Sequence, residues 1–387
     1  MSLSISSTPQ GFSTFITNLG IRDTSDDFVF IKSSVPCVAD GVFTQSLFAG
    51  PSVTISRNHL KDSQAQGIVV ISKNANVANG SIGIADAQEV LQLVAIETGL
   101  AAHNIVIAST GVIGRRYPIE KIRTGLLGLG KKLSAADFHA AARGIMTTDT
   151  VPKIATRQIG NAKLVGIAKG VGMIEPNMAT LLTFFFTDAA ISANNLRSIF
   201  RSTIDKTFNC LSVDTDTSTS DSAVILANGI AGEVSEVDFA SALQEVAQEL
   251  VLKIARDAEG ATKIIEVTVD SAINYTQAKI VAKAIVNSPL VKTAVYGADP
   301  NWGRVAMAIG KCENEQQINP ERVVISFDNV KVYPSSLTHE NLEQLRQIMS
   351  KDKVDIHVSL NIGKASATVW GCDLSEGYIE INGKYST

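Results

Sequence analysis

The stretch GIAKGVGMIEPNMATLLTFFF, residues 166–186, joins two apolar runs through a glycine-rich connection. Both runs predict strands, over 164–168 and 181–187, because they are short and rich in β-forming residues. The glycines between them permit backbone conformations that other residues avoid, and the Pro-Asn pair that follows predicts a turn. The stretch therefore predicts a buried sheet in which an Ala-Thr pair, residues 179 and 180, opens the second strand.

Short β-rich runs alternate with amphipathic helices along the rest of the chain, with no repeat and no low-complexity linker. We predict further strands at 28–33, 67–72, 105–108, 263–269, 323–327, 354–360, 367–370 and 378–381. We predict helices at 86–99, from 118 onward, at 134–143, 192–208 and 237–255, with Asp86, Ser134 and Ser192 as N-terminal caps and Gly99 as a helix stop. Hydrophobic helices beside many strands indicate a layered α/β or α+β protein.

The composition excludes several classes of protein. The 387 residues suffice for two or three lobes, and 45% hydrophobic with 19% charged residues is a globular composition. The 34 Lys and Arg against 38 Asp and Glu give a net charge of −4, which provides no attraction for nucleic acid. The longest apolar run, 181–186, is far short of the roughly 20 residues that span a bilayer. We therefore expect neither a nucleic-acid partner nor a membrane partner.

The N-terminus and the metal-binding residue types favour a cytoplasmic, metal-free protein. The first residues lack both the basic and the apolar region of a secretion signal. The five histidines include no i,i+4 pair, so a histidine metal site is not expected. Four widely spaced cysteines are typical of reduced, buried thiols rather than disulfides, and they are Cys37, Cys210, Cys312 and Cys372.

Three stretches approach known binding motifs without matching them. The segment 125–132 is close to a phosphate-binding loop, but Lys132 occupies the position of the required hydroxyl. Glu175 replaces the third glycine of a dinucleotide-binding fingerprint. In the acidic run DTDTSTSD, 214–221, a threonine stands where a calcium loop needs glycine, and the closing glutamate is missing. This run is either a solvated turn or a loop that supports a site, and its composition leaves both interpretations open.

Thr180 permits an unusual kind of catalysis. If the peptide bond before Thr180 broke, the new N-terminus would carry a hydroxyl and an α-amine on one residue, the nucleophile-plus-base arrangement of N-terminal threonine enzymes. A free α-amine titrates at about 7.7–8.0, close enough to neutrality to accept the hydroxyl proton. By itself, however, a threonine at the start of a strand is also what an ordinary buried strand contains.

The chain carries eight ordered blocks of sequence, which are NANVA (74–78), STGVIGR (109–115), IMTTDT (145–150), KGVGMIEPNMAT (169–180), DTDTSTSD (214–221), NSPLVKT (287–293), DPNWGR (299–304) and GCDLSEGY (371–378). Together these blocks resemble the ornithine acetyltransferase (glutamate N-acetyltransferase, ArgJ) family over essentially the full length of the chain. Eight such blocks in one order are a far more specific signal than any one of them alone.

This resemblance implies an αββα sandwich, two stacked sheets covered by helices, of the N-terminal-nucleophile type. It implies self-cleavage between Ala179 and Thr180, giving an alpha fragment, 1–179, and a beta fragment, 180–387, that remain folded together. Thr180 would then carry acetyl from N-acetyl-L-ornithine to L-glutamate in two steps. The acetyl-enzyme would separate the release of L-ornithine from the formation of N-acetyl-L-glutamate.

The same resemblance assigns further site residues by position. Thr110 and Gly111 match the oxyanion hole, which holds the negative charge of the tetrahedral intermediate with a hydroxyl and a backbone N–H. Lys169 suits an α-carboxylate as a compact cation, and Glu259 suits the amine of ornithine. The residues expected to contact substrate, in addition to Thr180, are Thr147, Lys169, Glu259, Asn382 and the C-terminal Thr387.

The resemblance further implies a heterotetramer of two alpha and two beta fragments, without a metal or cofactor. Acetyl-CoA remains open as a second acetyl donor. Two alternatives also remain: a fold-related, self-processing aminopeptidase or amidohydrolase, in which water replaces glutamate, and an uncleaved amino-acid-binding protein. The proposed carboxylate and amine contacts of Lys169 and Glu259 favour an amino-acid acceptor over water.

Overall fold

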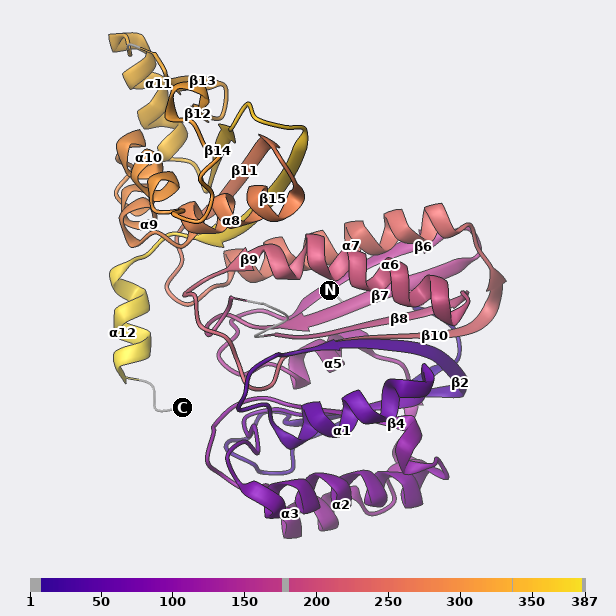
Figure 1. Cartoon of the computed structure of the whole chain (residues 1–387). Helices are drawn as coiled ribbons and strands as arrows, with labels where there is room; N and C mark the ends of the chain where they lie inside the picture. Colours follow the sequence, from indigo (N-terminus) through magenta and orange to yellow (C-terminus); the bar gives the residue numbers. More distant parts are fainter. Residues whose placement is uncertain (1–7, 176–180, 336, 385–387) are drawn as a thin grey trace. The chain divides into compact units, whose positions relative to one another are not determined.

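The computed structural model describes residues 8–175, 181–335 and 337–384 (Figure 1). These residues form two compact units. Unit one contains the described residues up to 209 together with 217–250, and unit two contains 210–216 and the described residues from 251 onward. The acidic run 214–221 is therefore divided between the two units.

Within the described part of unit one, nine strands form one sheet around the long strand β2 (Phe28–Phe43). From one edge the order is β4 (Ile105–Ser109), β3 (Gln64–Ile71), β2, β10 (Ser222–Glu233), β8 (Leu182–Ala190), β7 (Ala162–Lys169) and β6 (Lys153–Ile159). Strand β1 (Phe12–Thr17) pairs with β2 and with β5 (Ser134–Ala135).

Strand β2 belongs to two half-sheets. Its first part, 28–32, pairs with both β1 and β3, whereas its last part, 38–43, pairs with β10. We call β4, β3, β1, β5 and the first part of β2 the β3 half-sheet. The last part of β2, with β10, β8, β7 and β6, is the β8 half-sheet.

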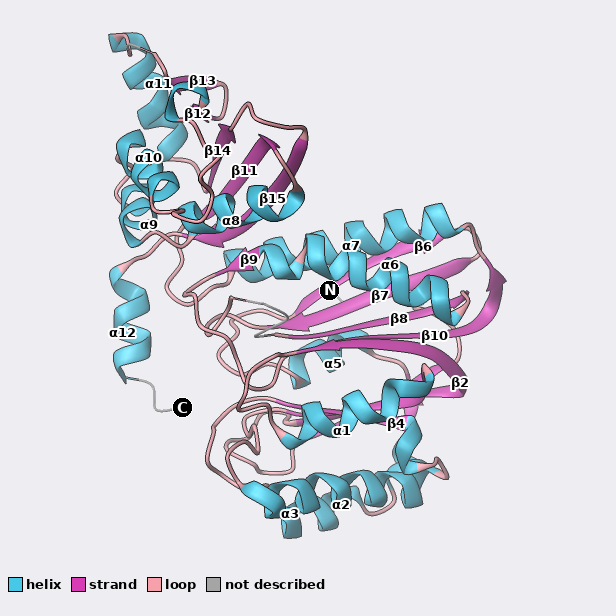
Figure 2. Cartoon of the chain, viewed as in Figure 1, coloured by secondary structure: helices cyan, strands magenta, loops and turns pink. Residues whose placement is uncertain are grey.

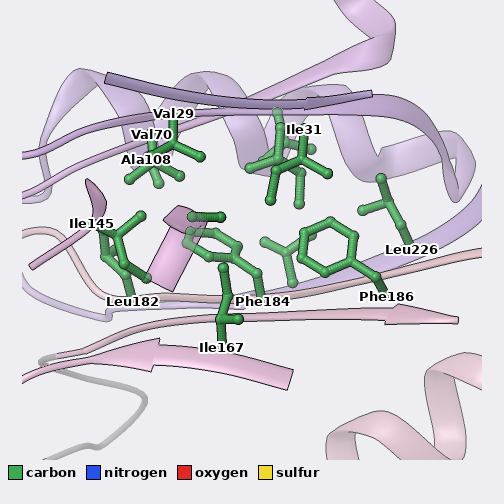
Figure 3. Close-up of a cluster of buried hydrophobic side chains, with 14 of the residues drawn as sticks. Val29, Ile31, Val70, Ala108, Ile145, Ile167, Leu182, Phe184, Phe186 and Leu226 are labelled. Carbon is green, nitrogen blue, oxygen red and sulfur yellow. The ribbon is translucent and has the colours of Figure 1, made fainter. Parts of the chain in front are cut away.

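A buried apolar core lies between the two half-sheets. Figure 3 shows side chains of the β8 half-sheet pointing toward those of the β3 half-sheet, namely Ile167, Phe184, Phe186 and Leu226 toward Val29, Ile31, Val70 and Ala108. The ring of Phe12 lies edge-on to that of Phe186, with centroids 5.5 Å apart. Each Val, Leu, Ile or Phe side chain in this core contributes about 1.5–3 kcal/mol when it leaves water. This core therefore holds the half-sheets stacked.

Helices cover the outer face of each half-sheet (Figure 2). The covering helices are α2 (Gly80–Thr98) and α3 (Ile119–Leu126) on the β3 half-sheet, and α6 (Ala193–Lys206) and α7 (Glu236–Arg256) on the β8 half-sheet. Phe185 points away from the central core, as strand alternation requires, and its ring lies 5.8 Å from that of Phe200 in α6. The layers are thus helix, sheet, sheet and helix, which is the predicted αββα sandwich.

Shorter elements complete unit one. They are α1 (Pro51–His59), α4 (Leu129–Lys132), α5 (Phe138–Gly144) and 3₁₀ turns at Leu60–Asp62 and Ala102–Asn104. A third 3₁₀ turn, Phe208–Cys210, lies where the chain passes from unit one to unit two.

Unit two has its own mixed sheet. Among its described residues the strand order is β13 (Val330–Tyr333), β12 (Val324–Phe327), β14 (Lys353–Ser359), β11 (Ile264–Ala272), β15 (Ala365–Cys372) and β9 (Leu211–Ser212). Its helices are α8 (Tyr275–Val286), α9 (Pro289–Tyr296), α10 (Trp302–Gly310), α11 (His339–Met349) and α12 (Glu376–Lys384), with a 3₁₀ turn at Pro320–Arg322. Every second residue of β14 is buried, namely Val354, Ile356 and Val358, so one face of this sheet is apolar.

Most predicted elements are confirmed. Nine of the ten predicted strands overlap observed strands, and Ser192 caps α6 by accepting from the amide of Asn195 at 3.3 Å. Gly99 ends α2 with a φ of +70°, the left-handed conformation typical of a helix stop. The helix predicted at 237–255 is confirmed as α7, and its apolar residues at helical spacing are all buried, namely Phe239, Leu243, Val246, Leu250 and Ile254.

Three local predictions are wrong. Helix α2 begins at Gly80 rather than near Asp86, because the Asp86 carboxylate is buried and accepts two hydrogen bonds from Arg116, at 2.9 and 2.8 Å. Ser134 lies in β5, and Asp137 caps the following helix instead. Residues 378–381 form part of α12 rather than a strand, since so short an apolar run fits either structure.

Candidate active site

Thr110 and Lys169 lie at the ends of strands from different half-sheets. Thr110 follows β4, Lys169 ends β7, and the Lys169 Nζ atom lies 3.1 Å from Thr110 Oγ1. In an open sheet of this strand order they would be five strand spacings apart, roughly 24 Å at about 4.8 Å per spacing. The stacking of the half-sheets therefore brings these two predicted site residues into contact.

The turn after Thr110 requires a glycine. Gly111 has a φ of +128°, and a Cβ atom there would lie 2.2 Å from the carbonyl carbon of Lys73. The amide of Thr110 donates to the Ile71 carbonyl at 3.0 Å, so this residue presents its side-chain hydroxyl to the site. Because that hydroxyl accepts a hydrogen bond from the Lys169 ammonium, its own proton is left to donate.

A buried carboxylate, Asp149, connects two of the predicted site residues. It accepts hydrogen bonds from the amide of Thr147 at 3.1 Å and from the amide of Gly170, next to Lys169, at 2.8 Å. It also forms an ion pair of 2.7 Å with Lys153, and neither side chain is exposed. Burial by itself would raise the pKa of Asp149. The positive charges of Lys169 and Lys153 lower it by more, so the pKa of Asp149 lies below its usual range. Asp149 therefore stays ionised and orders both segments.

Asp221 is a second buried acid near Lys169, and its pKa is shifted in the opposite direction. It is only 2% exposed, and its Oδ2 atom has no hydrogen-bond partner among the described residues. Burial raises its pKa well above the usual value, and the charge of Lys169 only partly offsets this. Of the two interpretations of the acidic run, a solvated turn is thus wrong for its last residue, which belongs to the interior of unit one.

An Asp221→Asn variant is expected to remove a pH dependence of stability. Because the folded-state pKa of Asp221 lies above the usual 3.8, its protonated form stabilises the fold fully below that value. This contribution is lost as the pH rises through the folded-state pKa, at up to about 1.4 kcal/mol per pH unit. Asparagine stays neutral, so the variant should gain stability over the parent chain as the pH rises.

Urea unfolding of the Thr180→Ala chain, which is predicted to stay uncleaved, measures this difference by far-ultraviolet circular dichroism, with and without Asp221→Asn. Asp137→Asn in the same host is the control, because both residue types cap a helix equally well. If the stability difference between the Asp221→Asn chain and its parent stays constant from about pH 4 to about pH 8, Asp221 does not titrate in this range.

Glu259 and Asn382 contact each other in unit two. The Asn382 side-chain amide donates to Glu259 Oε2 at 3.0 Å and to the Tyr378 carbonyl at 3.1 Å. The start of α12 packs closely on the loop after α7, since a Cβ atom at Gly260 would lie 2.2 Å from the Tyr378 amide nitrogen. This close packing holds the helix that carries Asn382 against the loop that carries Glu259.

The remaining predicted site residues, Ala179, Thr180 and Thr387, lie outside the described residues. The nearest described residue after Thr180 is Leu181, whose carbonyl accepts from the amide of Ser222 at 3.0 Å. One residue further on, Leu182 pairs with Lys169 across the antiparallel strands β7 and β8. The strand that follows the predicted cleavage point thus begins beside Lys169.

The sequence by itself indicates no role for Asp149 or Lys153. Asp149 lies in one of the family-like blocks, but a carboxylate among threonines is also typical of an exposed turn. The spacing of four residues between Asp149 and Lys153 was the only available signal of an ion pair. Their complete burial depends on strands far away in the sequence, and only the structure shows it.

The described residues contain no group of three or more His, Cys, Asp or Glu side chains arranged to hold a metal ion. Within these same residues, no helix is long and apolar enough to cross a membrane. Three of the four cysteines are buried thiols, as predicted, and Cys312 is partly exposed. Burial raises the pKa of Cys37 to about 11, so this thiol is not a nucleophile near neutral pH.

The two stacked half-sheets, covered by helices on their outer faces, define an α+β sandwich protein, and Thr110 lies beside the buried Lys169 at the edge where the half-sheets meet. Within this class, the sequence profile of the ArgJ family matches residues 13–387. The chain belongs to the ArgJ family.

Individual relatives cover the whole chain. It is 81% identical over 387 residues to arginine biosynthesis bifunctional protein ArgJ 2 of Nostoc sp., with 100% of both chains covered. It is 51% identical over 393 positions to glutamate N-acetyltransferase Oat2 of Streptomyces clavuligerus, again with 100% of both covered. A crystal structure of ArgJ from Bacillus halodurans is 39% identical and covers 51% of this chain and 96% of its own, with a TM-score of 0.47.

Proposed function

We propose that this chain is a self-processing acetyltransferase of arginine biosynthesis, which moves acetyl from N-acetyl-L-ornithine to L-glutamate. The products are L-ornithine and N-acetyl-L-glutamate. The observation that carries this proposal is the full-length similarity to proteins named arginine biosynthesis bifunctional protein and glutamate N-acetyltransferase. The contact between Thr110 and Lys169, beside the strand that follows residue 180, supports it from the structure.

The enzyme makes its own nucleophile in this proposal. The Thr180 hydroxyl attacks the Ala179 carbonyl carbon, the peptide C–N bond breaks, and the acyl group moves from nitrogen to oxygen. Water then hydrolyses the ester, leaving fragments 1–179 and 180–387. The pairing of Leu182 with Lys169 supports a cleavage point near the Lys169 ammonium and the Thr110 hydroxyl.

Acetyl transfer then uses the freed Thr180 twice. Its α-amine takes the hydroxyl proton, the oxygen attacks the acetyl carbonyl of N-acetyl-L-ornithine, and ornithine leaves with the proton. The amine of glutamate next attacks the acetyl ester and returns the proton to Thr180. In both steps the Thr110 hydroxyl and the Gly111 backbone N–H hold the negative oxygen. The hydrogen bond from Lys169 to Thr110 supports this role, because it orients the Thr110 proton away from the lysine.

The charged site residues bind different groups of the substrates. Lys169, which is 8% exposed, binds the α-carboxylate, and Thr147 contacts the substrate beside it. Glu259 binds the cationic amine of ornithine, with Asn382 and Thr387 completing this part of the site. The hydrogen bond from Asn382 to Glu259 supports their common assignment.

The processed fragments assemble as a heterotetramer of two alpha and two beta fragments and act in the cytoplasm, without a metal or cofactor. Acetyl-CoA is a second acetyl donor for glutamate in this proposal. The word "bifunctional" in the name of the relative from Nostoc sp. supports this second reaction.

Ornithine release from N-acetyl-L-ornithine, measured with and without glutamate, tests the proposed function. We expect steady turnover only when glutamate is present, with one N-acetyl-L-glutamate formed per ornithine. Ornithine release at full rate without glutamate would instead identify an amidohydrolase. Binding of N-acetyl-L-ornithine without any release, by an uncut chain, would identify an amino-acid-binding protein. A parallel assay with acetyl-CoA and glutamate tests the second donor.

Thr110→Val is expected to lower kcat for acetyl transfer by about 10²–10³-fold, the usual cost of removing one oxyanion-hole donor. Valine keeps the shape of threonine but cannot donate a hydrogen bond. Thr98→Val is the matched control, because the Thr98 hydroxyl only donates to the Val94 carbonyl of its own helix, at 2.7 Å. Equal kcat values for the Thr110→Val and Thr98→Val variants would show that Thr110 is not an oxyanion-hole donor.

A further inference from the structure

A cavity of about 300 Å³ in unit one is lined mainly by positively charged side chains. Its walls come from the last part of β2, from α1 and the turn after it, and from α6. Four cationic side chains line it, Arg57, Lys61, Arg197 and Arg201, whereas Asp40 is the one acidic side chain in this lining. The described lining thus has an excess of three positive charges.

Asp40 neutralises only part of this charge. Its carboxylate is 4% exposed and binds Arg201 through two atoms, with Nε at 3.0 Å and Nη2 at 3.2 Å. The Arg197 Nε atom lies 3.7 Å from the same carboxylate, beyond hydrogen-bond distance, and this buried nitrogen has no hydrogen-bond partner among the described residues. Asp40 therefore compensates the charge of Arg197 less completely than that of Arg201.

Neutral groups hold the arginines in place without cancelling their charge. Arg57 donates to the Thr44 carbonyl at 2.7 Å, and its guanidinium lies 6.0 Å from the centre of the Phe43 ring. Arg197 donates to the Ser63 hydroxyl at 2.6 Å. Because these contacts already restrict both side chains, a bound anion would lose little affinity to side-chain ordering.

We propose that this cavity binds a phosphorylated small molecule, most favourably one that carries a diphosphate. The planar guanidinium group donates two parallel hydrogen bonds that match phosphate oxygens, and three such groups converge here. A single carboxylate would leave most of the positive charge uncompensated, whereas a phosphate group brings about −1.5 to −2 charges, and a second phosphate brings more. This inference rests on the cavity alone and does not depend on the proposed acetyl transfer.

Calorimetric titration of the full-length protein with pyrophosphate, at fixed ionic strength, tests the proposal. We expect saturable binding of one pyrophosphate per chain, and weaker binding of inorganic phosphate. Lys61→Glu should weaken pyrophosphate binding by about tenfold or more, since it reverses one charge of the lining. Lys131→Glu is the matched control, because this exposed lysine carries the same charge change and does not line the cavity.

Arg57→Gln gives a second variant, which keeps a hydrogen-bond donor near the Thr44 carbonyl while removing the charge. It too should weaken pyrophosphate binding by about tenfold. The proposal would be overturned by the absence of saturable binding, or by equal losses in the Lys61→Glu and Lys131→Glu proteins. Citrate that binds as tightly as pyrophosphate would also overturn it, because the cavity would then select charge rather than phosphate.

Discussion

Thr180→Ala is expected to leave the protein as one chain of 41.1 kDa, whereas the unaltered protein separates into fragments of about 19 and 22 kDa in proportion to their lengths. Alanine has no hydroxyl to attack the preceding carbonyl, so neither self-cleavage nor acetyl transfer can begin. Intact-mass measurement under denaturing conditions, with N-terminal sequencing of the larger fragment, measures both outcomes. The larger fragment should begin at Thr180.

Thr180→Ser is the matched control for this experiment. Serine keeps the hydroxyl and, after cleavage, the α-amine on the same residue, so this variant should still process itself and transfer acetyl. Cleavage of the Thr180→Ala chain at the same bond would show that Thr180 is not the nucleophile. An unaltered protein that remains a single uncut chain would contradict the self-processing mechanism itself.

Asp149→Asn is expected to destabilise unit one by about 3–5 kcal/mol, the usual cost of removing one partner of a buried ion pair. The fully buried Lys153 ammonium would lose its 2.7 Å ion pair with the Asp149 carboxylate. The same change disturbs the hydrogen bonds to Thr147 and Gly170, which position two proposed substrate contacts. We therefore also expect a loss of about 10²-fold in kcat/KM for acetyl transfer in any variant protein that folds.

Stability is measured by urea unfolding of the uncleaved Thr180→Ala chain, because a single chain unfolds without the separation of two fragments. Hydrogen exchange in β7 and β8 reports unit one, and the fluorescence of the chain's two tryptophans, Trp302 and Trp370, reports unit two. The Asp149→Asn, Lys153→Met double variant should lose less stability than the sum of the two single losses, because it removes both charges of this buried ion pair together. An Asp149→Asn chain as stable as the exposed-cap variant Asp137→Asn would contradict a buried ion pair.

Local signals in the sequence were sufficient for many elements. Ser192 and Gly99 delimit helices as predicted, because a cap and a left-handed stop are properties of a few adjacent residues. The same kind of signal failed at Asp86, which has the right residue type for a cap but pairs with Arg116, 30 residues away. A local rule cannot anticipate such a partner, since the competing ion pair forms only when distant segments pack together.

The chain's own pattern of residues determined the strands, the buried face of α7 and the apolar strand after residue 180, because periodicity and β-propensity act over short distances. The site residues came from resemblance to a family rather than from spacing. Only the tertiary structure decided that Thr110 and Lys169 touch, because their strands stand five spacings apart in the sheet and meet when the half-sheets stack. It also decided that the pKa of Asp149 is lowered and that of Asp221 raised, since burial and the nearby lysine charges control both pKa values.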